Sequence, residues 1–249
     1  MLAPGKRAAF GDGRKIIWGP WSAEIFKHNP KIARPGQERD GDLQWFKYHK
    51  GSRWYNSPAQ DCWIWNYDFR VSPGEICFGP DDRAAAETGY VVIEPNVPWH
   101  KSVAPNKDWG EAKFQVIADM LRREGADVVQ FSHGKRRLAG VRVIETPTIR
   151  RALAALALAG LAIVPEGGLH HAAAALDVPA IVLFGGFIPP AIMGYDGHEN
   201  LTGGATEFCG RKFRCEHCAE AMAAISVEQV YSIAWQWLNA GKTTRSKQA

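Results

Sequence analysis

A glycine pair that follows a strongly apolar stretch is the part of the sequence best suited to chemistry. Residues 161–164 are all apolar, which predicts a strand covered on both faces. Glu166, Gly167 and Gly168 come next, and an Ala-rich stretch over residues 169–176 predicts a helix. A helix N-terminus exposes unpaired amides and a partial positive charge, and glycines let a diphosphate approach the backbone. The spacing fits a phosphate-binding turn, and it fits equally a tight turn that binds nothing.

Two side chains beside this turn suit a nucleotide ligand. His171 falls in the first turn of the predicted helix, from where its ring can face bound phosphates. Glu166 would repel a phosphate, whereas its carboxylate can accept hydrogen bonds from ribose or sugar hydroxyls. A nucleotide diphosphate that carries a sugar would therefore use both side chains.

Strands and helices alternate from about Tyr90 onward, and this order predicts the fold class. The predicted strands are short apolar or β-branched runs at residues 90–94, 126–131, 141–144, 161–164 and 180–184. The predicted helices cover residues 109–123, 147–159, 169–176 and 226–238. The alternation predicts an α/β fold with a Rossmann-type parallel sheet, whose ligands bind beyond the carboxyl ends of the strands.

The glycine turn is part of a longer stretch that resembles a known family. Pro165-Glu-Gly-Gly-Leu-His-His and the Ala-rich run up to Phe184-Gly185 are similar to the signature of the ADP-heptose:lipopolysaccharide heptosyltransferases. That signature has Asp-Thr-Gly, His, an Ala-rich helix, Gly-Val-Pro, a strand and Phe-Gly. Pro105-Asn-Lys-Asp-Trp109 resembles the Lys-x-Trp-Pro segment of the family, and residues 209–218 resemble its cysteine-containing segment. These motifs occur in the order that the family has.

The resemblance implies a GT-B-like fold of two lobes, in which the C-terminal lobe binds a nucleotide-diphosphate sugar. Residues 90–240 would form that lobe, with Lys107 on the donor phosphates and His171 in the phosphate-binding turn. Glu166 and Gly167 stand where the family has Asp and Thr. A longer carboxylate and a missing hydroxyl leave the identity of the donor sugar open.

The N-terminal stretch departs more from the family. Residues 1–89 would form a reduced, aromatic-rich lobe that binds the acceptor, and residues 241–249 a flexible tail. Phe10-Gly-Asp-Gly13 resembles the early Gly-Asp of the family, which makes Asp12 the expected base that deprotonates the acceptor hydroxyl. Gly-Asp-Gly is also an ordinary turn. Tryptophans in this lobe can stack on sugars or bases, or can pack a small core.

These features predict a glycosyltransferase that uses a nucleotide-diphosphate sugar as its donor substrate and requires no cofactor. We expect a metal-independent displacement at the anomeric carbon. The acceptor is open: it is a glycan or, given basic clusters such as Lys135-Arg136-Arg137, a base of DNA. A non-catalytic nucleotide-sugar-binding module is the alternative, because the N-terminal lobe is short and the Asp-Thr-Gly segment is altered.

The charged residues are compatible with a phosphorylated ligand. The formal net charge of +4 is too small to indicate a nucleic-acid partner by itself. Lys101, His100 and His133 fall in predicted strand-end loops. Together with Lys107 they would make the binding cleft positive.

A cysteine cluster near the C-terminus offers a second kind of chemistry. Cys209, Cys215 and Cys218, with His217 beside the last, have the residue types of a zinc site. Their spacing is not that of a standard zinc finger. Free cysteines that pack a loop are the alternative, and we expect no metal to be required.

Neither membrane insertion nor export is indicated. The sequence lacks an apolar run of the roughly 20 residues that span a bilayer. Its first residues lack the apolar core of a signal peptide. We therefore expect a cytoplasmic protein without a membrane span. An oligomer is compatible with the sequence, since a second copy of the chain could complete the short N-terminal lobe.

Overall fold

A six-stranded parallel sheet forms the centre of the computed structural model, which describes residues 2–47, 53–82, 87–98 and 100–245. The strand order is β10-β9-β8-β5-β6-β7, and all neighbouring strands are parallel. The strands are β5 (Val91–Ile93), β6 (Val128–Phe131), β7 (Arg142–Ile144), β8 (Leu161–Pro165), β9 (Ala180–Leu183) and β10 (His198–Leu201). The predicted α/β fold with a Rossmann-type parallel sheet is confirmed.

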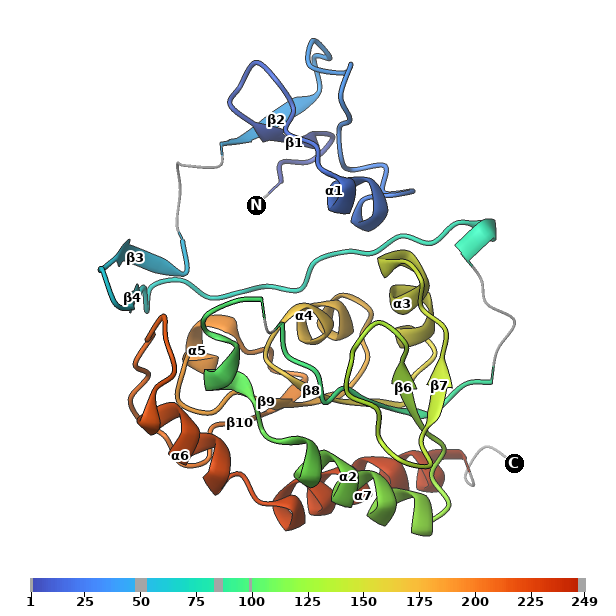
Figure 1. Ribbon diagram of the computed structural model, residues 1–249. Helices are drawn as coiled ribbons and strands as arrows, with labels where there is room; N and C mark the ends of the chain where they lie inside the picture. Colours follow the sequence, from blue (N-terminus) through green and yellow to red (C-terminus); the bar gives the residue numbers. More distant parts are fainter. Residues whose placement is uncertain (1, 48–52, 83–86, 99, 246–249) are drawn as a thin grey trace.

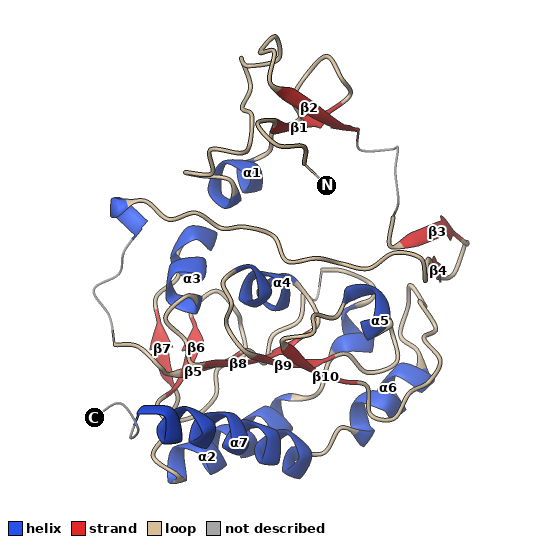
Figure 2. Ribbon diagram, turned by 180° about the vertical axis from the view of Figure 1, so that it is seen from behind, coloured by secondary structure: helices blue, strands red, loops and turns tan. Residues whose placement is uncertain are grey.

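Helices cover both faces of this sheet (Figure 2). One face carries α2 (Glu111–Arg123) and α7 (Val227–Arg245), the other carries α3 (Ile149–Leu156), α4 (Gly168–Ala175) and α5 (Pro190–Met193), and α6 (Glu216–Ala224) lies at the β10 end. Because both faces are covered, β8 and β9 are buried throughout, which explains their apolar sequences. Two cores result, one around Phe131 and Val182 and the other around Phe114 and Ile163.

The strand order reverses at β5. The chain continues to β6 and β7 on one side of β5 and then returns through α3 to β8 on the other side. Ligands of open parallel sheets bind at such a switch point, beyond the carboxyl ends of the strands. Glu94 follows β5 and Glu166 follows the paired strand β8, so these two residues flank the switch point.

Two elements near the C-terminus differ from the sequence-based expectations. The sequence does not predict β10, because His-Glu-Asn-Leu has neither apolar alternation nor β-branched residues; the strand forms along the open edge of β9. Helix α7 continues to Arg245, so residues 241–245 of the predicted tail are helical, and residues 246–249 lie outside the described residues. Within the described ranges, no helix has both the length and the apolar character needed to cross a membrane.

Residues 2–47 form a small unit of their own, which we call the N-terminal unit. Its elements are β1 (Arg7–Gly11), α1 (Pro20–Ile25) and β2 (Leu43–Lys47). β1 and β2 pair in parallel, and a small core gathers around Ile16 and Ala33. Figure 1 shows this unit, in dark blue, on the side of the sheet that carries α3 and α4.

The aromatic stretch that follows packs with the large sheet. Its elements are β3 (Tyr55–Pro58), β4 (Trp63–Trp65) and the 3-10 turn η1 (Pro80–Asp82). Trp65 is 7% exposed and is part of the core around Phe131, and its Nε1 donates to the Phe208 carbonyl at 2.9 Å. After β4 the chain crosses in extended form to η1, shown in cyan in Figure 1. Residues 53–82 therefore pack with the C-terminal sheet, whereas the sequence places the lobe boundary at Gly89.

A charge cluster around the buried carboxylate of Asp82, which we call the Asp82 cluster, joins the N-terminal unit to the sheet. Asp82 is 5% exposed and accepts a hydrogen bond from Arg150 Nη2 at 2.6 Å. Lys27 Nζ lies 3.7 Å and His28 Nε2 lies 3.5 Å from the same carboxylate. The Arg150 amide, in the first turn of α3, donates to Glu24 Oε2 of α1 at 3.0 Å. The hydrogen bond from Arg150 lowers the pKa of Asp82, so the carboxylate is charged.

We expect Asp82→Asn to destabilise the protein strongly, because it leaves the buried Arg150 guanidinium without its carboxylate. Removing one partner of a buried ion pair costs about 3 kcal/mol of the free energy of unfolding. Asp81→Asn changes an exposed carboxylate of the same turn and should cost less than about 0.5 kcal/mol. Urea unfolding followed by circular dichroism measures both variants. Equal stabilities would contradict the role assigned to the Asp82 cluster.

Candidate functional site

A buried ion pair marks the carboxyl end of β8. The Glu166 side chain is 5% exposed, and it pairs through Oε2 with Lys107, which is 15% exposed. Lys107 ends the turn η2 (Ala104–Lys107), which follows β5. The Lys107 ammonium also lies 5.0 Å from the centre of the Phe187 ring. The fold thus brings together two residues, distant in sequence, that the sequence analysis assigns to one site.

The glycine turn leaves open space in front of α4. This helix begins at Gly168, and its N-cap residue Gly167 has no side chain that could cap the first turn. Among the described residues, a Cβ added to Gly168 would meet no atom within 4 Å, and one added to Gly167 would meet the Pro165 carbonyl at 4.0 Å. Packing against the protein therefore does not require either glycine. Open space beside uncapped amides suits an anionic ligand.

His171, in the first turn of α4, connects the ion pair to a tyrosine. Its Nδ1 lies 2.8 Å from the Tyr195 hydroxyl, and its Nε2 lies 3.9 Å from Glu166 Oε1. Burial lowers the pKa of His171, and the Glu166 charge opposes this shift. The ring is therefore neutral near pH 7, and it carries its proton at Nε2 when Tyr195 donates to Nδ1. No sequence pattern points to Tyr195, because this residue follows α5 in an irregular stretch.

The neighbouring His170 is buried without hydrogen-bond partners. Its side chain is fully buried, and within the described part of the chain neither ring nitrogen is paired. The rings of Tyr195, Phe184 and His198 surround it at centroid distances of 5.0, 5.4 and 5.4 Å. Burial lowers the pKa of His170 to about 2, so the ring is neutral at physiological pH. His170 and His171 are adjacent in the sequence, and only the structure shows that His170 is buried without hydrogen-bond partners among the described residues, whereas His171 contacts Tyr195 and Glu166.

A second charged pair lies at the carboxyl end of β5. Glu94 is 3% exposed, and its Oε2 lies 3.1 Å from His133 Nε2. The Asn96 amide donates to the other oxygen of Glu94 at 2.8 Å. The hydrogen bond to Glu94 raises the pKa of His133. His133 is a candidate from the sequence, whereas Glu94 is not, because the sequence predicts it as the last residue of a strand.

Two predicted site residues lie apart from these pairs. Lys101 is exposed in the loop before η2, and its amide donates to the Pro98 carbonyl at 2.8 Å. Asp12 is exposed in the turn after β1, where its Oδ1 accepts the amides of Arg14 and Lys15, both at 2.7 Å. These two amides lower the pKa of Asp12, which makes it a weaker base. The roles of Lys101 in donor binding and of Asp12 in catalysis stay predictions.

Among the described residues, two groups of side chains have metal-ligating types at short range. The ligand atoms of Glu166, His170 and His171 lie within 4.8 Å of one another, and so do those of the predicted zinc ligands. The latter are Cys209, Cys215, His217 and Cys218. Their convergence favours a metal site over cysteines that only pack a loop, because three thiols and one imidazole are a usual ligand set for a structural metal.

An Asp-x-Asp pair also occurs in the N-terminal unit. Asp40 and Asp42 have this spacing, but each has a carboxylate oxygen 2.6 Å from the Arg7 guanidinium. Their contacts give them a structural role beside β1. They therefore provide no argument for a catalytic metal, and metal-independent transfer stays a prediction.

A match to a known protein family covers the sheet and the residues at its carboxyl edge. Residues 78–222 match the model of glycosyltransferase family 9 (heptosyltransferase). The chain belongs to this family. The matched region contains the large sheet from β5 to β10 together with Lys107, Glu166 and His171. Among curated proteins, none matches the chain.

The chain is similar to several solved structures at low sequence identity. The dodecameric iron-containing heptosyltransferase TibC, in complex with ADP-D-beta-D-heptose, is matched over 96% of this chain and 78% of its own, with a TM-score of 0.61 and 12% identity. E. coli ADP-heptose lps heptosyltransferase II is matched over 68% of this chain and 54% of its own, with a TM-score of 0.49 and 16% identity. The family 9 glycosyltransferase of Veillonella parvula DSM 2008 is matched over 61% of this chain and 46% of its own, with a TM-score of 0.47 and 19% identity. The chain spans about half the length of the last two. The match to TibC supports the predicted GT-B-like fold.

His170 leads us to expect a loss of stability in mild acid. Its folded pKa of about 2 lies below the 6.5 of an ordinary histidine. Unfolding therefore takes up a proton below about pH 6.5, and stability falls as the pH decreases, by about 1.4 kcal/mol per pH unit for one such group. His170→Leu should flatten this slope, whereas the exposed His100→Gln should keep it. Urea unfolding between about pH 7.5 and 5.5 measures the slope; an unchanged slope in His170→Leu would exclude His170 as its source.

Proposed function

We propose that the protein is a glycosyltransferase that transfers a sugar from a nucleotide-diphosphate donor to an acceptor whose identity is open. The observation that carries this proposal is the Lys107–Glu166 pair beside the uncapped N-terminus of α4, at the switch point of a family 9 sheet. A cation and free amides suit a diphosphate, and a buried carboxylate suits hydroxyl donors.

In the proposed reaction, the acceptor oxygen forms a bond to the anomeric carbon while the bond from that carbon to the diphosphate oxygen breaks. The nucleotide diphosphate leaves with the electron pair of the broken bond, so negative charge grows on its terminal phosphate. The amides at the start of α4 and the Lys107 ammonium would stabilise this charge, as would an Nε2–H of neutral His171. The proton of the acceptor passes to a base.

Donor binding would change the partners of Lys107. The ammonium pairs with Glu166, and a diphosphate at α4 would offer it a second anion. Glu166 would then accept hydrogen bonds from ribose or sugar hydroxyls. TibC was solved with ADP-D-beta-D-heptose, so adenine nucleotides are the first donors to test. The sugar is not specified, because Glu166 and Gly167 replace the Asp and Thr of the family signature.

Asp12 is the proposed base for the acceptor. Both amides of its turn bind Oδ1, so Oδ2 is the oxygen that can accept the proton of an acceptor hydroxyl. A glycan or a nucleic-acid base as acceptor, a cytoplasmic location and an oligomer stay predictions. The second candidate function is a nucleotide-sugar-binding module without catalysis, favoured by the engagement of Asp12 in its own turn.

Lys107→Met should weaken ADP binding about tenfold or more, because a hydrogen bond to a charged group contributes about 1.5 kcal/mol. This variant leaves Glu166 buried without a cation, so the double variant K107M/E166Q tests the same contact in a charge-balanced site. Lys6→Met removes an exposed lysine of the N-terminal unit and is the matched control. Calorimetry with a panel of nucleoside diphosphates provides the affinities. If both Lys107 variants bind as tightly as the wild type, the donor site lies elsewhere.

Asp12→Asn should leave the nucleotide affinity unchanged and slow transfer about 100-fold, as the loss of a general base does. Asp68→Asn, which alters another exposed carboxylate, should transfer at the wild-type rate. Mass spectrometry of products formed from ADP-sugars with glycan and DNA acceptors measures transfer. Nucleotide binding by the wild type without any product would favour the binding module.

A further inference from the structure

Tyr195 is a buried residue beside the proposed donor site, and the proposed transfer reaction gives it no role. It is 7% exposed and lies in the turn between α5 and β10. Its hydroxyl lies 2.8 Å from His171 Nδ1. Among the described residues, His171 is the one hydrogen-bond partner of this hydroxyl. Any effect of the hydroxyl on the donor site therefore passes through the His171 ring.

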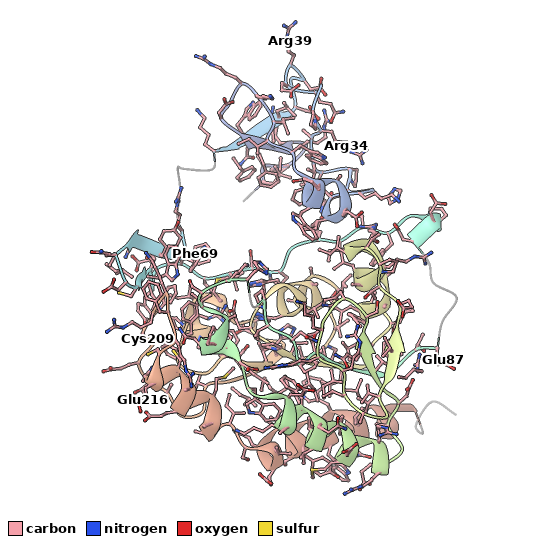
Figure 3. All side chains as sticks on the ribbon, in the orientation of Figure 1. Arg34, Arg39, Phe69, Glu87, Cys209 and Glu216 are labelled. Atoms are coloured by element: carbon pink, nitrogen blue, oxygen red, sulfur yellow. The ribbon has the colours of Figure 1, made fainter. Side chains whose placement is uncertain are left out.

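Contacts on both sides of the turn fix the position of Tyr195. On one side, the Tyr195 carbonyl accepts the side-chain amide of Asn200, a residue of β10, at 3.1 Å. On the other side lies the extended segment after β4, on which Figure 3 labels Phe69. The Val71 amide of this segment donates to the Ile192 carbonyl of α5 at 2.9 Å. The turn therefore holds the phenol in place beside α4.

Three histidine rings surround the phenol ring. The ring centroids of His170, His198 and His171 lie 5.0, 5.5 and 5.8 Å from that of Tyr195, at interplanar angles of 65°, 70° and 84°. Neither ring nitrogen of His170 has a hydrogen-bond partner in the described part of the chain, so His170 does not compete for the hydroxyl. The packing thus leaves the hydroxyl to His171 Nδ1.

Both partners of this hydrogen bond are neutral near pH 7. Burial raises the pKa of Tyr195, so the hydroxyl keeps its proton. Burial lowers the pKa of His171; the Glu166 charge opposes this shift, and the Lys107 charge adds to it. A neutral imidazole carries one proton, on Nδ1 or on Nε2, and its other nitrogen is an acceptor. The groups around the ring decide which nitrogen carries the proton.

These groups favour the proton of His171 on Nε2. With the proton on Nδ1, the ring would donate to the Tyr195 oxygen, and the phenol proton would have no acceptor among the described residues. A bare Nε2 would also face Glu166 Oε1 at 3.9 Å, which turns a lone pair towards a buried carboxylate. With the proton on Nε2, the phenol donates to Nδ1 and an N–H faces the carboxylate, so neither cost arises.

We propose that Tyr195 is a positioning residue, which holds His171 in the Nε2–H form and directs this N–H to the diphosphate of the donor. This inference rests on the proposed transfer function. His171 lies in the first turn of α4, whose first amides have no side-chain cap. As the bond between sugar and diphosphate breaks, negative charge grows on the terminal phosphate, and an N–H that already faces this phosphate stabilises the charge without reorientation.

NMR of the full chain with isotope-labelled histidine tests the tautomer without any nucleotide. Wild-type His171, assigned by the loss of its signals in His171→Gln, should carry its proton on Nε2. In Tyr195→Phe the fraction of the Nδ1–H form should rise about tenfold, because one hydrogen bond to Nδ1 is lost. Tyr67→Phe, which alters an exposed tyrosine, should leave the fraction unchanged. A proton on Nδ1 in the wild type, or a tautomer that Tyr195→Phe does not change, would overturn the proposal.

Transfer kinetics test the role of Tyr195 in the reaction. Tyr195→Phe should lower kcat about tenfold and change the donor KM less than about threefold, because the N–H acts mainly on charge that develops in the transition state. Tyr67→Phe should keep the wild-type kcat. A wild-type kcat in Tyr195→Phe, or a tenfold rise in KM at unchanged kcat, would contradict the positioning role.

His171→Gln separates positioning from a purely structural role of Tyr195. A Gln amide can donate to the diphosphate but has no tautomers, so adding Tyr195→Phe to this variant should change kcat less than about twofold. The same tenfold loss in both backgrounds would show that Tyr195 acts by another route and would overturn the proposal. A wild type that transfers no sugar would overturn the proposed function instead, while the tautomer measured without nucleotide still accepts or rejects the contact.

Discussion

A carboxylate buried at the end of a parallel strand needs a cation beside it, and this requirement organises the site. Glu166 follows β8, which is buried along its whole length. Lys107 supplies the cation, because η2 carries it across from the end of the neighbouring strand β5. The turn itself depends on buried Asn106, whose partners lie before α6. The proposed donor site and the cysteine cluster are therefore parts of one hydrogen-bonded arrangement.

The sequence predicts the large sheet well because its strands and helices are recognised from patterns within short stretches of residues. Apolar runs and short helical stripes identify β5 to β9, and their alternation is enough to fix a parallel arrangement. The strand β10 has no such pattern, since its residues pair only because β9 offers an open edge. The boundary at Gly89 follows from composition, whereas the position of Trp65 depends on a contact with Phe208, far along the chain. The periodic pattern of apolar residues cannot reveal contacts between residues that are far apart in the sequence.

The same distinction applies to the candidate site. The glycine turn and His171 are close in sequence, so their spacing fits one shared ligand, as it also fits a tight turn that binds nothing. Tyr195 and Glu94 come from other elements, and only the folded sheet shows that they lie beside the predicted residues. The cysteine spacing matches no standard motif, and yet the loop and the first turn of α6 bring the ligand atoms together. The sequence shows which residue types the candidate site can use, whereas only the folded structure shows which of these residues lie close together.

The Asp82 cluster has a mechanical consequence for the two parts of the protein. A buried hydrogen bond joins Asp82 to Arg150, and a partly buried one joins Arg150 to Glu24. Hydrogen bonds weaken steeply when their distance or angle departs from the preferred geometry. Rotation of the N-terminal unit against the sheet would have to break them together. The interface would therefore resist small displacements and would separate only when these hydrogen bonds break. Arg150 lies on α3, the helix that precedes β8, so a displacement at this interface would pass through α3, the connecting turn and β8 before it reached Glu166.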